Sequence, residues 1–320
     1  MQEALSAKAA HDDLRRLEQN IELVIRGKHQ SVRMAITGLL AGGHVLFEDV
    51  PGVGKTTLAQ CLAMSINVTF QRIQGTSDLL PSDILGVSVW DNDKKAFVFR
   101  AGPIFANIVL VDEINRTTPK TQSALLEAMN TAQVSIDRNT YDLAQPFMVI
   151  ATQNPFDSHG TFPLPKSQLD RFMMRLHLGY PDAEYEREIL RNTRSTGDLT
   201  MVKPVLSSER IRAMQEGVRR VRVDDSLVDY IVNLINATRH SPLIELGAST
   251  RAALALRNCA KANAYMDGRD YAIPDDVKAV AVSVLAHRLG IIRTFEETAE
   301  SLGEGSSAVR AILEETPVPI

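Results

Sequence analysis

The sequence has 320 residues, 44% of them hydrophobic and 23% charged, with a formal net charge of −4 at pH 7. This length exceeds one average domain and suits two domains of unequal size with ordinary packed cores. The slightly acidic balance excludes a global attraction to nucleic acid or to anionic membranes, while a local basic surface is still compatible with it.

The two cysteines, Cys61 and Cys259, lie far apart, each within an apolar helical pattern. The sequence has no CxxC pair or Cys/His cluster with the spacing of a zinc site. We therefore expect both thiols to be reduced and buried in the core. Because there is no signal peptide and no apolar run long enough to span a bilayer, we expect a cytoplasmic protein without membrane insertion.

Two helices are predicted before the first strand. Residues 1–22 mix alanine, leucine and charges as an amphipathic helix does, and a second helix is expected over residues 30–40. Gly42 and Gly43 end that helix and lead into residues 44–47, an apolar run typical of a short buried strand.

A glycine-containing loop follows this strand and precedes a helical pattern at residues 58–66. In a strand, loop and helix of this kind, backbone N–H groups surround a phosphate chain at the positive end of the helix. Lys55 would reach the β- and γ-phosphates, and the Thr56 hydroxyl would ligate Mg²⁺. The full pattern G-x-x-x-x-G-K-[ST] has glycine where this chain has Asp49. The alternative is a surface turn before an amphipathic helix. The residues expected to bind nucleotide here are Pro51, Gly52, Val53, Gly54, Lys55, Thr56 and Thr57.

Two hairpins are predicted between the core elements. After an alternating strand pattern at residues 68–73, apolar runs at 86–90 and 96–100 flank a polar tip, and a second pair lies at 134–136 and 141–143. The first hairpin either packs as a small ribbon or projects to touch a partner or the pore of a ring, and the pattern favours neither.

Polar side chains follow two further buried strands. The apolar run at residues 106–111 ends in Asp112 and Glu113, and the run at 147–151 is followed by Asn154. Ligands of α/β sheets bind at the carboxyl ends of strands, so Asp112 is expected to hold magnesium and Glu113 to polarise an attacking water. Asn154 would orient that water or contact the γ-phosphate if the two strands are neighbours. Paired acids alone would fit a solvated turn equally well.

A cation precedes the last predicted strand, residues 173–178. Arg171 either pairs with Asp170 or another acid on the surface, or is offered to the nucleotide of an adjacent subunit. Such arginine fingers are worth about 10³–10⁵ in rate, so an outward-facing Arg171 predicts an oligomer with active sites at its interfaces. Head-to-tail contacts of this kind close into rings.

Helical patterns dominate after Pro181, at residues 182–191, 208–219, 226–239, 250–265 and 274–288. Polar and turn residues cluster at 197–204, which places a domain boundary there and divides the chain into 1–196 and 197–320. Ser249 is expected to cap a helix, which puts Arg251 in its first turn. A cation is unfavourable there unless an anion is close, so Arg251 is a candidate phosphate sensor.

Five strings together resemble the AAA+ ATPases, and within them the MoxR family, over nearly the whole chain. They are EDVPGVGKT at residues 48–56, VDEINR at 111–116, QSALLEAM at 122–129, ATQNP at 151–155 and LDRF at 169–172. Asp49 in place of glycine fits the variation of that family. The resemblance implies an α/β nucleotide-binding domain with a central parallel sheet, followed by a smaller all-helical lid, with ATP and Mg²⁺ as cofactors.

The same resemblance assigns a role to each candidate residue. It implies a Walker A loop at Lys55 and Thr56, a Walker B motif at Asp112 and Glu113, sensor 1 at Asn154, an arginine finger at Arg171, sensor 2 at Arg251, and contact with adenine by Val24, Ile25 and the residues up to Gly27. The hairpins match the helix-2 insert and the pre-sensor-1 hairpin. The resemblance also implies a hexameric ring that acts in a chaperone-like role with partners that contain a von Willebrand factor A domain.

The sequence thus predicts an ATP-hydrolysing motor that remodels or matures a partner protein. One alternative is a DNA-remodelling ATPase, although the hairpin tips at residues 91–95 and 137–139 are mixed in charge and argue against nucleic acid. Another alternative is a nucleotide-dependent binding scaffold with little turnover.

Overall fold

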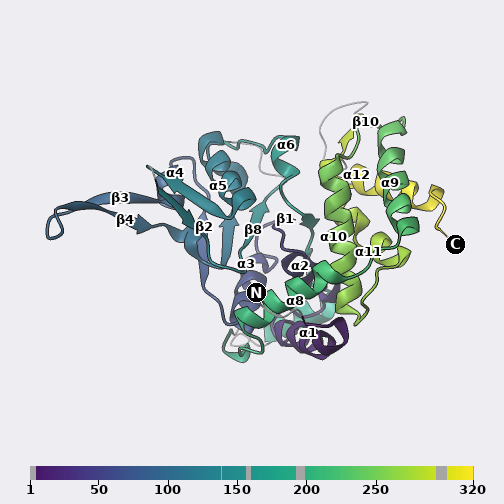
Figure 1. Ribbon diagram of the computed structural model, residues 1–320, viewed down its shortest axis with the longest axis horizontal. Helices are drawn as coiled ribbons and strands as arrows, with labels where there is room; N and C mark the ends of the chain where they lie inside the picture. Colours follow the sequence, from purple (N-terminus) through teal and green to yellow (C-terminus); the bar gives the residue numbers. More distant parts are fainter. Residues whose placement is uncertain (1–4, 138, 156–159, 192–198, 293–300, 320) are drawn as a thin grey trace.

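The structure is a computed structural model that describes residues 5–137, 139–155, 160–191, 199–292 and 301–319. A central sheet lies between a projecting hairpin on one side of the molecule and a group of C-terminal helices on the other (Figure 1). In the described part of the chain, no helix is long and apolar enough to cross a membrane.

The central sheet has five strands in the order β2-β5-β8-β1-β9. All four pairings between neighbouring strands are parallel, which confirms the predicted α/β class. The strands are β1 (Val45–Glu48), β2 (Phe70–Gln74), β5 (Ile108–Asp112), β8 (Met148–Gln153) and β9 (Met174–Leu176). Because β8 lies between β5 and β1, the carboxyl ends of these three strands meet at one edge of the sheet.

Strand β5 shows why the sheet strands are almost continuously apolar. Ile108 and Leu110 belong to a hydrophobic cluster on one face of the sheet, whereas Val109 and Val111 belong to a second cluster on the other face. A parallel strand that is covered on both faces buries every residue, so alternation with polar residues is absent.

Helices cover both faces of this sheet. Buried residues of α1, α2 and α3 belong to the first cluster, and those of α4 and α5 to the second. Thr118 caps α5 and Pro119 occupies its first position, as predicted. The helices up to residue 191 are α1 (Ala7–Glu22), α2 (His29–Leu40), α3 (Lys55–Ser65), α4 (Pro81–Leu85), α5 (Pro119–Thr131), α6 (Lys166–Leu169) and α7 (Ala183–Arg191).

The C-terminal part is helical, as predicted, with two elements that the sequence did not reveal. These are a two-stranded antiparallel sheet of β10 (Ile244–Leu246) and β11 (Gly290–Ile291), and a final helix, α12 (Ser301–Glu315). The helix predicted to reach residue 288 ends at Leu285 and continues as a 3₁₀ turn. The other helices are α8 (Ser208–Arg220), α9 (Asp225–His240), α10 (Thr250–Met266) and α11 (Pro274–Leu285).

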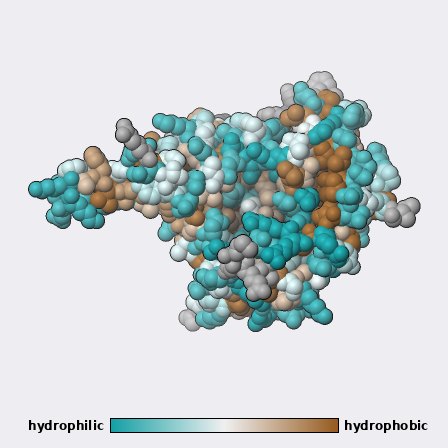
Figure 2. Space-filling model, viewed as in Figure 1, coloured by the Kyte–Doolittle hydropathy of each residue, from teal (hydrophilic) through white to brown (hydrophobic). Residues whose placement is uncertain are grey.

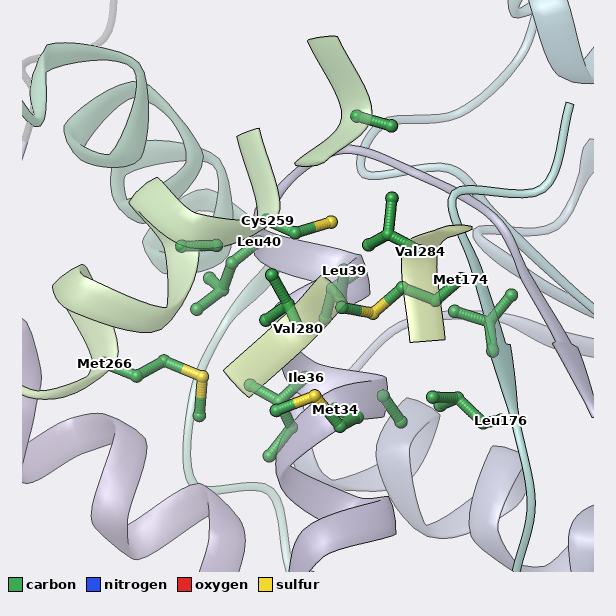
Figure 3. Close-up of a cluster of buried hydrophobic side chains, with 14 of the residues drawn as sticks. Met34, Ile36, Leu39, Leu40, Met174, Leu176, Cys259, Met266, Val280 and Val284 are labelled. Carbon is green, nitrogen blue, oxygen red and sulfur yellow. The ribbon is translucent and has the colours of Figure 1, made fainter. Parts of the chain in front are cut away.

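One core joins the C-terminal helices to the sheet. Figure 3 shows side chains of α2, β9, α10 and α11 packed together, among them Met34, Met174, Cys259 and Val280. Helix α8 also contacts α1, α2 and α10. The expected boundary at 197–204 begins in residues outside the described ranges, and the division into 1–196 and 197–320 stays a prediction.

Both cysteines are free thiols in this core. Cys61 of α3 and Cys259 of α10 are fully buried. Burial raises the pKa of each thiol to about 12, so neither forms a thiolate near neutral pH. Their expected role as reduced core residues is confirmed.

The two predicted hairpins are present and contact each other. They are formed by β3 (Gly86–Asp91) with β4 (Ala96–Ala101), and by β6 (Gln133–Ile136) with β7 (Asn139–Asp142). The rings of Phe99 and Tyr141 are stacked 4.2 Å apart, and Ser88 Oγ donates to Asp137 Oδ2 at 2.8 Å. Beyond this base, the first hairpin projects from the body (Figure 1) and carries apolar surface behind a hydrophilic tip (Figure 2).

Candidate active site

The loop between β1 and α3 has the backbone conformation that its glycines allow. Gly52 and Gly54 have φ values of +86° and +100°, which side chains on L-residues disfavour. Gly54 precedes α3, which begins at Lys55. The predicted succession of buried strand, glycine loop and helix is therefore confirmed, and the N-terminus of an 11-residue helix faces the loop.

Lys55 turns its ammonium group back into this loop. Its Nζ donates to the carbonyl oxygens of Asp49 at 2.8 Å and Val50 at 2.9 Å. Burial lowers the pKa of Lys55, and the nearby carboxylates of Asp49, Asp112 and Glu113 oppose that shift. A cation at a helix N-terminus opposes the helix dipole, an arrangement that a bound anion would make favourable.

Thr56 and Asp112 meet at the edge of the sheet. Thr56 Oγ1 lies 3.4 Å from Asp112 Oδ2, and Asp112 Oδ1 accepts a hydrogen bond from Thr152 Oγ1 at 3.1 Å. One hydroxyl and one carboxylate beside a phosphate-binding loop fit Mg²⁺, which keeps several waters and takes few protein ligands. The residues expected to hold magnesium are therefore close enough to do so.

Strand β2 adds two residues that the sequence analysis missed. Arg72 Nε pairs with Asp112 Oδ2 at 2.7 Å, and Gln74 Nε2 donates to Glu113 Oε2 at 3.2 Å. The signal lies in the pairing of β2 with β5, which sets Gln74 opposite Asp112. The sequence alone does not show this pairing, so it presents Arg72 only as a polar residue in an alternating strand pattern. Arg72 Nε thus approaches the same Asp112 oxygen as Thr56 Oγ1.

Glu113 is held in a strained and well-defined position. Its φ of +55° is unusual for a residue with a side chain, and its N–H donates to Thr152 Oγ1 at 2.9 Å. The carboxylate accepts one hydrogen bond from Gln74 Nε2 and another from Arg116 Nη1 at 3.4 Å. Positive φ at a non-glycine residue costs of order 1–3 kcal/mol and persists where surrounding contacts determine it.

These elements enclose one cleft of about 330 Å³. Asn154, which follows β8, also lines this cleft, so the two acids and the amide lie together as predicted. Val53 does not line the cleft and packs on the hydrophobic core. The lining residues are Pro51, Gly52, Gly54, Lys55, Thr56, Thr57, Arg72, Gln74, Asp112, Glu113, Thr152 and Asn154.

The segment expected to contact adenine lies beside the loop. A Cβ built on Gly54 would be 3.8 Å from Ile25 Cδ1 and 3.7 Å from Leu178 Cδ2. Val24 packs on the edge of the same core. The position of Val24 and Ile25 therefore agrees with base contact, which stays a prediction.

Arg171 and Arg251 are not among the described residues that line the cleft. Arg171 is half-buried, and its Nη1 donates to the carbonyl oxygen of Leu126 in α5 at 3.1 Å. Arg251 is 60% exposed and lies 3.9 Å from Asp170 Oδ2. Neither arginine therefore lines the cleft of its own subunit, and Arg251 lies beside Asp170.

Asp170 connects the C-terminal helices to the segment that carries Arg171. Ser249 Oγ, which caps α10 as predicted, donates to Asp170 Oδ2 at 3.3 Å. The guanidinium of Arg288 is buried, lies 3.5 Å from Asp170 Oδ1 through Nε and donates to the carbonyl oxygen of Phe172 at 2.7 Å through Nη2. Burial lowers the pKa of Arg288, and Asp170 opposes that shift.

Comparisons with known proteins agree with this geometry. Residues 44–174 match the family described as "ATPase family associated with various cellular activities (AAA)", and residues 236–311 match the AAA lid domain. The protein YeaC of Bacillus subtilis, described as uncharacterized, is 45% identical over 313 residues, covering 97% of this chain and 96% of YeaC.

Two further relatives cover most of the chain. Chaperone MoxR1 of Mycobacterium tuberculosis is 40% identical over 291 residues, covering 88% of this chain and 76% of MoxR1. A crystal structure from Cytophaga hutchinsonii superposes with a TM-score of 0.87 at 36% identity, over 98% of this chain and 96% of that one. The chain therefore belongs to the MoxR family of AAA+ ATPases.

Proposed function

We propose that the protein binds ATP with Mg²⁺ in the cleft below the β1–α3 loop and hydrolyses it to ADP and phosphate. The observation that carries this proposal is the meeting of Lys55, Thr56, Asp112, Glu113 and Asn154 in one cleft at the carboxyl edge of the sheet. Lys55 and the loop amides would bind the phosphates. This is the position at which open α/β sheets bind their ligands.

Thr56 and Asp112 would hold the magnesium ion. When bound, Mg²⁺ neutralises charge on the β- and γ-phosphates. Arg72 pairs with the same Asp112 oxygen that approaches Thr56, so release of Arg72 from that oxygen would accompany loading of the site. The guanidinium is half-exposed and can move into solvent, while the magnesium ion would replace its positive charge beside the buried Asp112 carboxylate.

Glu113 would polarise the attacking water, and Asn154 would orient it or contact the γ-phosphate. Gln74 and Arg116 hold the Glu113 carboxylate, and its backbone is fixed through Thr152. A general base in a defined position contributes about 10²–10⁴ in rate.

Arg171 and Arg251 would serve the nucleotide of a neighbouring subunit. Neither arginine lines the cleft of its own chain, which supports this assignment. Each subunit then needs the next one for a complete site, and head-to-tail contacts of this kind close into a ring. We propose a homo-oligomer, with the hexamer that the family resemblance implies.

Hydrolysis would drive the remodelling or maturation of a partner protein, such as one with a von Willebrand factor A domain. Trp90 and Phe97 on the projecting hairpin are 51% and 71% exposed and pack edge to face. Exposed aromatic residues rather than clustered cations support contact with protein over contact with nucleic acid. The name Chaperone MoxR1 of a relative fits this direction.

The test is ATP turnover measured over a range of protein concentrations, with sedimentation of the same samples. We expect specific activity to rise as the oligomer forms, and Lys55→Ala to abolish turnover. Turnover by Lys55→Ala at the wild-type rate would refute the site. Salt-dependent DNA binding that requires the hairpins would favour the DNA-remodelling alternative. Maturation of a client protein by Glu113→Gln to the same extent as by wild type would favour the scaffold alternative.

A further inference from the structure

Asp49 stands where the phosphate-loop pattern has glycine, and this residue, which follows β1, is 9% exposed. A negative charge beside bound phosphates is repelled unless it is directed away from them and compensated. Asp49 is also not one of the described residues with positive φ, so the backbone does not need glycine at this position.

The carboxylate points to the chain that continues from β9. Asp49 Oδ2 accepts from the N–H of Leu178 at 2.5 Å, and Oδ1 accepts from the N–H of Gly179 at 3.2 Å. These bonds extend the β1–β9 pairing, whose last backbone partners are Phe47 and Leu176. The phosphate loop is thereby fastened to residues 178–179.

This fastening reaches the part of the loop beside which Ile25 lies. Leu178 and Ile25 converge on Gly54 at the end of the loop, as the distances from its built Cβ show. Tyr180 also accepts a hydrogen bond from Lys28 Nζ at 2.5 Å through its carbonyl oxygen, which ties residues 178–180 to the segment that contains Ile25. Leu178 and Ile25 therefore form one apolar wall next to the loop.

We propose that Asp49 is a positioning residue for the base half of the nucleotide site. By binding the two N–H groups, it holds Leu178 against Ile25 and sets the distance between the apolar wall and the phosphate-binding amides. This inference rests on the proposed binding of ATP. It predicts that loss of the carboxylate weakens contacts with the base while the phosphates still bind.

Two probes separate the halves of the site. Isothermal titration with Mg²⁺ compares ATP with inorganic tripolyphosphate, which lacks the base and ribose. Hydrogen bonds to a charged group are worth about 1.5–3 kcal/mol, so we expect Asp49→Asn to weaken ATP binding by about tenfold or more. Tripolyphosphate affinity should stay within about twofold, because neither the loop amides nor the hydrogen bonds of Lys55 to backbone carbonyl oxygens involve the Asp49 carboxylate.

Leu178→Ala tests the same wall from the other side. This variant should bind ATP more weakly and bind tripolyphosphate as the wild type does. The double variant Asp49→Asn/Leu178→Ala should lose no more ATP affinity than the single variant with the larger loss, because both changes disrupt one unit. Asp224→Asn is the matched control: this carboxylate also accepts a backbone N–H, from Ser226 at the start of α9, and its loss should leave both affinities unchanged.

The outcomes distinguish this inference from the proposed function. Equal losses for ATP and tripolyphosphate in Asp49→Asn, or no loss of ATP affinity in a folded Asp49→Asn variant, would overturn the positioning role. Lys55→Ala should weaken both ligands, and unchanged binding by that variant would instead overturn the nucleotide site itself. Thermal unfolding of the same samples identifies a variant that does not fold, in which case the other variant decides.

Discussion

Glu113 combines an unusual backbone conformation with a carboxylate held by two neighbouring side chains. Glu113→Gln keeps the size of the side chain and removes its ability to accept a proton. We expect kcat to fall by about 10²–10⁴ while ATP affinity is retained, because the loop and Lys55 bind the phosphates. Steady-state turnover and equilibrium binding on the same samples measure the two effects.

The control for this substitution is Glu127→Gln on α5, which removes the charge of an exposed carboxylate away from the cleft. It should leave turnover unchanged. Wild-type turnover by Glu113→Gln would remove this residue from the reaction.

His44 provides a pH test of the core beneath the loop. The buried ring accepts the N–H of Val149 on Nδ1 at 2.9 Å and donates from Nε2 to the carbonyl oxygen of Met129 at 2.9 Å, which defines the neutral tautomer. Burial lowers the pKa of His44 from 6.5 to about 4. The unfolded chain therefore takes up a proton at higher pH than the folded one, and the fold loses stability as pH falls from 6.5 toward 4.

His44→Asn should accordingly be less stable than wild type by about 1–3 kcal/mol at pH 7, because buried hydrogen bonds are lost. The difference in free energy of unfolding between the two proteins should be smaller at pH 4.5, where the wild type has lost the stability that its neutral ring provides. Urea unfolding at the two pH values measures this. An equal difference at both pH values would show that His44 does not titrate as proposed.

The sequence was sufficient to find the site residues whose side-chain type and local motif indicate their role. Lys55, Thr56, Asp112 and Asn154 each follow a recognisable strand or loop, and the cleft contains all four. Thr152 and Arg72 were missed, because their roles depend on which strands are neighbours. The bonds of Asp49 to residues 178–179 were missed for the same reason, since nothing local signals a partner more than a hundred positions away.

At the scale of elements, long periodic patterns were sufficient to predict the sheet strands and most helices. The missed sheet of β10 and β11 contains strands of three and two residues, too short for alternation to be visible. The contact between the two hairpins was also beyond sequence reasoning, because Phe99 and Tyr141 belong to different apolar patterns and meet only after folding.

The ring stack between the hairpins makes a prediction of its own. Tyr141→Ala should lower the free energy of opening the first hairpin by about 0.5–1.5 kcal/mol, the usual contribution of an aromatic pair beyond its buried area. Hydrogen exchange of the β3 and β4 amides should become faster, while exchange in β1 stays unchanged. Tyr141→Phe retains the ring and serves as the control. Equal exchange in Tyr141→Ala and wild type would show that the hairpins are independent.

At the scale of the molecule, the C-terminal helices share a core with the sheet rather than forming a detached unit. The sequence predicted where helices replace strands, but it could not show that α10 and α11 pack on α2 and β9. This packing fixes the place of Arg251. Arg251 lies 3.9 Å from Asp170, which precedes Arg171 in the sequence, and neither arginine lines the cleft of its own chain.

The central claim is that Arg171 completes the active site of a neighbouring subunit. The most direct measurement mixes Arg171→Ala subunits, which retain an intact Glu113, with Glu113→Gln subunits, which retain an intact Arg171. Each variant alone should assemble and be inactive. An equal mixture should regain up to about a quarter of wild-type turnover, because one interface in four then joins an intact cleft to an intact arginine. Wild-type turnover by Arg171→Ala alone, at every concentration, would contradict the account.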